Sequence, residues 1–122
     1  MKIIVDLDGT LTVDDKNKEY PDKLPDEAMI ETLREYRSNG FEITIFTARN
    51  MRSLNGDIEM IKQKTLPIII EWLNYHNVPY DDIIVGKPWC GDDGFYIDDR
   101  AIRPSEFKDL SYYEIMELMN GK

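Results

Sequence analysis

Two aspartates stand one residue apart near the start of the chain, in the sequence DLDGT at positions 6–10. Like charges held a few ångströms apart cost free energy unless a cation or a shared proton compensates for them. A carboxylate can attack an electrophile, transfer a proton or bind a hard cation. Asp6 and Asp8 therefore predict nucleophilic, acid–base or metal chemistry at this position.

Three further groups of polar residues follow apolar runs with the composition of β-strands. They are Thr47 after the run 41–46, Lys87 after the run 83–85, and Asp98 with Asp99 after the run 95–97. Ligands of parallel α/β sheets bind beyond the carboxyl ends of the strands. We therefore expect these groups to meet the opening pair at one edge of a sheet. Carboxylates there would bind a divalent cation, and oxygen ligation with few protein ligands favours Mg²⁺, which also takes a phosphate oxygen.

The segments between these four predicted strands show helical patterns. The patterns run from Pro25 to Asn39, from Ile58 to His76 with a break near Leu66-Pro67, and from Ser111 to Met119. Strands that alternate with helices predict the α/β class, with a mostly parallel central sheet. The segments 13–24 and 49–56 carry no clear pattern.

Length, charge and cysteine content restrict the function further. A chain of 122 residues predicts one domain, residues 1–122. Its net charge of −9 argues against nucleic acid or an anionic membrane as a partner. One cysteine, Cys90, cannot form an internal disulfide, and no signal-peptide pattern precedes the first strand, so we expect a cytoplasmic protein.

In this order along the chain, the four motifs resemble those of phosphohydrolases of the haloacid dehalogenase superfamily. The longer strings TARNMR, LPIIIEWL and VGKPWCGDDGFYIDDRAIRPSEF are also similar to a narrow subgroup of small proteins that lack a cap domain and are associated with capsule or polysaccharide biosynthesis. The resemblance implies a Rossmann-like three-layer sandwich without a cap. It also implies an Mg²⁺-dependent phosphatase of a sugar phosphate or related metabolite.

The resemblance assigns a role to each motif residue. Asp6 is the expected nucleophile that forms an aspartyl-phosphate, and Asp8 the expected acid and then base. Thr47 and Lys87 are expected to bind the transferring phosphoryl group. The expected Mg²⁺ ligands are Asp6, the backbone carbonyl of Asp8, and Asp98 or Asp99. The expected substrate-binding residues are Thr10, Arg49 and Arg52. The two arginines are chosen because they flank the motifs in an acidic protein and guanidinium suits anionic or sugar ligands; the alternative is that they are surface charges in salt bridges.

The segment 13–24 is too short to form a cap domain, which predicts an open active site. That segment, the loop 49–56 or a neighbouring subunit of a homo-oligomer is expected to cover it.

A phosphorylatable receiver-like signalling domain is the alternative function. Such a domain is also a small α/β protein with an acidic pair, a threonine or serine, and a Lys-Pro like Lys87-Pro88. The order of the motifs argues against it, because a receiver has its acceptor aspartate at the end of a middle strand. This chain has Thr47 at that place.

Overall fold

The computed structural model describes residues 1–121, which belong to two compact units, Met1–Trp89 and the described residues from Cys90 onward. We call them the N-terminal unit and the C-terminal unit. The first holds a parallel sheet with its helices, and the second holds two short helices. Each is described by itself below.

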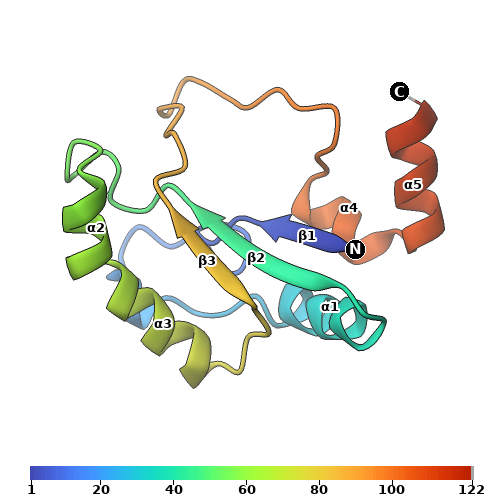
Figure 1. Cartoon of the computed structure of the whole chain (residues 1–122), viewed down its shortest axis with the longest axis horizontal. Coiled ribbons are helices and arrows are strands. Elements are labelled where there is room, and N and C mark those ends of the chain that lie inside the picture. The colour runs from blue at the N-terminus through green and yellow to red at the C-terminus, as the bar shows by residue number, and fades with distance from the viewer. Residues whose placement is uncertain (122) are drawn as a thin grey trace. The chain divides into compact units, whose positions relative to one another are not determined.

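The sheet of the N-terminal unit has three parallel strands in the order β1-β2-β3. The strands are β1 (Lys2–Val5), β2 (Glu42–Thr47) and β3 (Asp82–Val85). In register, Val5 pairs with Ile45 and Thr47 pairs with Val85. The three arrowheads of Figure 1 therefore point to the same end of the sheet, and the loops that follow the strands begin at one edge. The predicted α/β class with a parallel sheet is confirmed.

Three helices and one 3₁₀ turn connect these strands: η1 (Tyr20–Asp22), α1 (Glu27–Ser38), α2 (Ile58–Lys64) and α3 (Leu66–Tyr75). Helix α1 begins after Asp26, whose side chain accepts a hydrogen bond from the Met29 N–H. The predicted break in the second helical pattern is confirmed at Thr65. Pro67 lies in the first turn of α3, where its missing N–H costs no helical hydrogen bond. Among residues 1–121, no helix is both long and apolar enough to cross a membrane.

The core of the N-terminal unit contains side chains from β2, α1 and α3 and from the loop after β1. Its fully buried members include Leu7, Leu11, Ile30, Leu33, Ile43, Ile45, Ile69 and Leu73. Burying one such side chain contributes roughly 1.5–3 kcal/mol to folding. Leu7 and Leu11 lie on either side of Asp8 in the sequence, so the core fixes the loop that carries the carboxylates.

The C-terminal unit contains α4 (Pro104–Asp109) and α5 (Tyr112–Gly121). Ser111 caps α5 at the start of the predicted pattern: its hydroxyl accepts from the Glu114 N–H, and the Glu114 carboxylate accepts from the Ser111 N–H. Helix α4 was not predicted, because six residues are too few to show a helical period.

The predicted fourth strand, Phe95 to Ile97, is wrong. These residues have irregular backbone, and Phe95 and Ile97 are 76% and 90% exposed. A run of three residues with high β-propensity becomes a strand only when another strand pairs with it, and none within residues 1–121 does so. Asp98 and Asp99 consequently do not follow a strand. They are exposed at a turn in which Asp98 accepts from the Arg100 N–H.

Candidate active site

The loop after β1 turns back on the carbonyl of Leu7. That oxygen accepts hydrogen bonds from the N–H groups of Thr10, Leu11 and Thr12, at 3.2, 2.8 and 3.1 Å. Gly9 permits the turn because its φ of 79° lies in the left-handed region. The Leu7 side chain is buried, whereas its neighbours Asp6 and Asp8 are half-exposed. The loop therefore holds both carboxylates at the carboxyl end of β1.

Asp6 lies between a hydroxyl and an ammonium group. The Thr10 hydroxyl donates to Oδ2 of Asp6 at 3.1 Å, and Nζ of Lys87 lies 3.6 Å from Oδ1. Lys87 reaches this position after Gly86, which has a φ of 89°, and its N–H donates to the carbonyl of Thr47 at 3.1 Å. The ends of β1, β2 and β3 thus contribute to a single cluster.

The environment of Asp6 raises the pKa of its carboxyl above the usual value. The main cause is burial, which removes water from the charged form. Lys87 and the Thr10 hydroxyl act in the opposite direction without cancelling it, and the nearby Asp8 adds to the rise. The charged form of Asp6 therefore lowers the stability of the folded protein, and a further cation nearby would stabilise the carboxylate.

Replacing Asp6 with asparagine is expected to stabilise the metal-free protein at pH 7. The raised pKa means that charged Asp6 is less favourable in the folded than in the unfolded state, and this cost is present above its folded pKa. The stability difference between Asp6→Asn and the unchanged protein should shrink as pH falls through that pKa. It should vanish below the unfolded value, where the aspartate is protonated in both states. Urea unfolding in EDTA over this pH range measures it, and a difference independent of pH contradicts the assigned cause.

Asp8 is paired with Arg49 through two parallel hydrogen bonds. Nε of Arg49 lies 2.9 Å from Oδ2 of Asp8, and Nη2 lies 2.8 Å from Oδ1. Arg49 is only 4% exposed, and its guanidinium carbon lies 4.2 Å from the centre of the Tyr20 ring. Its backbone N–H donates to the hydroxyl of Thr47 at 3.1 Å. Sequence reasoning did not identify Tyr20, because it lies in the 13–24 segment, which has no regular pattern.

The loop 49–56 is held by its own hydrogen bonds. Asn50 has a φ of 62°, its side-chain carbonyl accepts from the Thr65 hydroxyl at 2.8 Å, and its amide donates to the Ser53 hydroxyl at 2.9 Å. The Leu54 N–H donates to the Asn50 carbonyl at 2.9 Å. The bond to Thr65 connects the loop to the end of α2, and the other two close the loop on itself. Arg52, in the same loop, is exposed.

The structure thus brings together six of the residues that the sequence singled out: Asp6, Asp8, Thr10, Thr47, Arg49 and Lys87. Asp98 and Asp99 belong to the C-terminal unit. Within residues 1–121, no three His, Cys, Asp or Glu side chains form a group that could hold a metal ion. A half-exposed carboxylate such as Asp6 offers the oxygen ligands that Mg²⁺ prefers.

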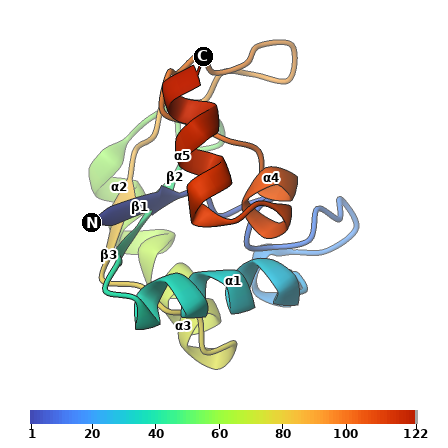
Figure 2. The ribbon, with the colours of Figure 1, turned by 90° about the vertical axis from the view of Figure 1, so that its right-hand side faces the viewer.

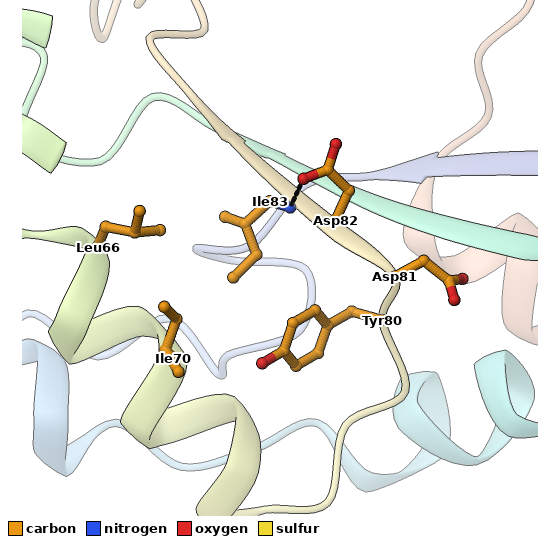
Figure 3. A pocket seen from close by; sticks show the side chains of 6 residues that line it. All are labelled: Leu66, Ile70, Tyr80, Asp81, Asp82 and Ile83. Atoms are coloured by element: carbon orange, nitrogen blue, oxygen red, sulfur yellow. Dashed lines mark hydrogen bonds between the residues drawn. The ribbon is translucent and has the colours of Figure 1, made fainter.

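A pocket of about 220 Å³ lies elsewhere in the N-terminal unit, between α3 and the start of β3. Figure 3 shows its lining residues, Leu66, Ile70, Tyr80, Asp81, Asp82 and Ile83. One of its carboxylates has a structural role: Asp81 accepts from the Ile43 N–H at 2.8 Å and pairs with Arg37. These contacts, the backbone hydrogen bond first, lower the pKa of Asp81. No residue of the candidate site lines this pocket.

Comparisons with known proteins identify the family of the chain. A crystal structure of a protein from Vibrio cholerae matches with a TM-score of 0.96 and 58% sequence identity, over 98% of this chain and 97% of that one. No curated protein matches the chain. Residues 3–82 match the family of haloacid dehalogenase-like hydrolases, which favours a hydrolase over a receiver domain. The match covers two carboxylates, Asp6 and Asp8, with Thr47 and Arg49, and ends before Lys87. The chain therefore belongs to the haloacid dehalogenase-like hydrolases.

Proposed function

We propose that this hydrolase is an Mg²⁺-dependent phosphatase that cleaves phosphomonoesters through an aspartyl-phosphate on Asp6. The observation that carries the proposal is the position of Asp6, 3.6 Å from the Lys87 ammonium and hydrogen-bonded to Thr10, with Asp8 two positions further along the chain. The Asp6 carboxylate is thus available to attack phosphorus, and the Asp8 carboxylate to donate and accept protons.

In the first step, an oxygen of Asp6 attacks phosphorus and the bond from phosphorus to the leaving oxygen breaks. Lys87 neutralises negative charge on the carboxylate and on the phosphoryl group as they approach. Thr47 at the end of β2 is 1% exposed, and its hydroxyl accepts from the Arg49 N–H. Its assignment to the phosphoryl group in this proposal comes from the family motif. Asp8 gives a proton to the departing oxygen, so that an alcohol and not an alkoxide leaves.

In the second step, water attacks the phosphorus of the aspartyl-phosphate. Asp8, which lost its proton in the first step, takes a proton from that water. The bond between phosphorus and the Asp6 oxygen breaks, inorganic phosphate leaves, and both carboxylates return to their initial states. Splitting the displacement in two lets one acid–base residue serve both halves.

Mg²⁺ would be held by Asp6, by the backbone carbonyl of Asp8, and by Asp98 or Asp99. When bound, it supplies positive charge beside the phosphoryl oxygens and the nucleophile. The raised pKa of Asp6 supports this assignment, because a cation there would favour the carboxylate that must attack. Asp98 and Asp99 are included among the proposed ligands only because the family motif contains them.

The proposed substrate is a sugar phosphate or a related metabolite of polysaccharide or capsule biosynthesis. Its support is the similarity of three sequence strings to proteins with that association and the exposed Arg52 of the loop 49–56, which can pair with an anionic or hydroxyl-rich group. A homo-oligomer that covers the open site and a cytoplasmic location also belong to the proposal. The single cysteine supports the location.

A screen of phosphorylated metabolites with and without Mg²⁺ tests this function. We expect hydrolysis of p-nitrophenyl phosphate and faster hydrolysis of some sugar phosphates, both abolished by EDTA and restored by added Mg²⁺. Phosphate release is measured over a range of protein concentrations, with light scattering on the same samples to show whether activity follows oligomer formation. Full activity in EDTA, or no hydrolysis of any phosphomonoester, contradicts the proposal.

A further inference from the structure

We infer that Arg49 acts on Asp8 and not on the substrate. Its guanidinium fixes the direction of the carboxylate that transfers protons, and the Tyr20 ring holds the guanidinium in place. Arg49 is therefore a positioning residue. The inference rests on the proposed function, because it assigns Arg49 a part in the proton transfers of that reaction.

The Arg49 side chain is closed off from solvent, and its contacts are directed to Asp8 and Tyr20. Two of its nitrogens donate to the two oxygens of Asp8, at 2.9 and 2.8 Å. The remaining nitrogen, Nη1, is buried and has no hydrogen-bond partner among the described residues. One face of the guanidinium meets the Tyr20 ring. The Arg49 side chain is only 1% exposed, against 28% for the Asp8 side chain. A phosphate or sugar that arrives from solvent thus meets Asp8 and not Arg49.

The paired hydrogen bonds determine which lone pairs Asp8 can use. Two carboxylate oxygens together offer about four acceptor positions. Arg49 occupies one on each oxygen, and its planar fork fixes the plane of the carboxylate. One position on each oxygen remains for a proton. Without Arg49 the Asp8 carboxylate could rotate, and fewer of its orientations would face the leaving oxygen or the attacking water.

Tyr20 links this pair to the 13–24 segment. Its ring lies over the Arg49 guanidinium on one side and has Nζ of Lys23 5.2 Å from its centre. The Lys23 carbonyl accepts from Nε1 of Trp72 on α3 at 2.8 Å. The two ends of the segment meet where the Val13 N–H donates to the Leu24 carbonyl at 2.8 Å. The stacked ring is thus anchored to the fold, which is what a positioning contact needs.

A double-mutant cycle on turnover tests the role of Arg49. Arg49→Met is expected to lower kcat by about 10²-fold, the size of effect that misplacement of a reacting group produces, with KM changed less than about threefold. Its loss should be larger on a sugar phosphate than on p-nitrophenyl phosphate, as for Asp8→Asn. Adding Arg49→Met to Asp8→Asn should cost no more than about threefold further, because the group that Arg49 positions is already lost. Arg37→Met, which breaks another arginine–carboxylate pair, is the control and should keep full activity.

Two further variants separate positioning from general damage to the fold. Added guanidinium ion should restore part of kcat to Arg49→Ala and none to the double variant Asp8→Asn, Arg49→Ala. Tyr20→Phe keeps the ring and should keep most of kcat, whereas Tyr20→Leu should lose roughly tenfold or more, because a stacked ring is what fixes the guanidinium.

The possible results of these experiments distinguish a failure of the inference from a failure of the proposed function. A rise in KM with unchanged kcat for Arg49→Met makes Arg49 a substrate contact and overturns the inference, as do losses that multiply in the double variant. The same cycle measured on urea unfolding reports the pairing without any catalysis. If the unfolding cycle shows strong coupling of Asp8 and Arg49 but the protein hydrolyses no phosphomonoester, the proposed function is overturned. The positioning role of Arg49 in catalysis is then overturned with it, although the two side chains are still paired.

Discussion

Asp6→Asn is expected to reduce turnover of every phosphomonoester by at least about 10⁴-fold, since removal of a covalent nucleophile eliminates the main reaction path. Asparagine keeps the size of the side chain and can still accept from the Thr10 hydroxyl, which donates to Oδ2 in the unchanged protein. It loses the negative charge that faces Lys87 3.6 Å away. The effect should therefore fall on kcat, with the fold intact.

The measurement is phosphate release under saturating Mg²⁺, with urea unfolding of the same preparations. Because Asp6→Asn should be at least as stable as the unchanged protein at pH 7, unfolding cannot explain a lost activity. Asp82→Asn is a matched control: Asp82 is an exposed carboxylate at the start of β3, at the opposite end of that strand from Lys87. Turnover by Asp6→Asn within tenfold of the unchanged protein would remove Asp6 from the nucleophile role.

The sequence predicted the sheet of the N-terminal unit because its strands are local features with strong signals. Each of the three is a short apolar run bounded by polar or turn residues. The predicted runs 41–46 and 83–85 differ from β2 and β3 by no more than one residue at either end. The break between α2 and α3 was equally local, since Pro67 restricts its own turn. The run 95–97 has the same composition as these strands, but strand formation depends on a pairing partner that composition does not report.

The contacts within the site also divide into those that local sequence predicts and those that depend on residues far apart in the chain. The sequence placed Asp6, Thr47 and Lys87 at strand ends, and parallel strands bring such ends together. The pairing of Arg49 with Asp8 joins residues 41 positions apart and depends on rotamers and burial that no spacing encodes. Tyr20 was missed for a related reason: its place over Arg49 follows from the anchoring of Lys23 by Trp72, a contact between positions 49 apart.

The second large effect is expected for Asp8→Asn, and its size should depend on the leaving group. The variant keeps Asp6 as nucleophile and keeps the backbone carbonyl of residue 8 as a metal ligand, but it has no proton to give. A sugar phosphate, whose departing alkoxide is strongly basic, should lose roughly 10²–10⁴-fold in kcat/KM, the usual contribution of general acid–base catalysis. p-Nitrophenyl phosphate should lose far less in kcat/KM, because its phenoxide leaves without protonation. Its hydrolysis should instead become limited by the second step, since water attack loses its base.

The experiment compares kcat/KM of Asp8→Asn on the two substrates with that of the unchanged protein. Mass spectrometry of the stopped reaction looks for a phosphorylated chain, which should accumulate on p-nitrophenyl phosphate. The affinity for Mg²⁺, measured separately by calorimetry, should stay the same, because the carbonyl and not the carboxylate of Asp8 is the proposed ligand. Equal losses on both substrates with unchanged Mg²⁺ affinity would contradict the role of Asp8 as leaving-group acid. A loss of activity that parallels a loss of Mg²⁺ affinity would make Asp8 a structural residue. The structure favours the expected outcome, an unequal loss on the two substrates with unchanged Mg²⁺ affinity. Arg49 binds both oxygens of Asp8 and draws its carboxylate into a fixed pair beside Asp6 rather than into the metal-binding set.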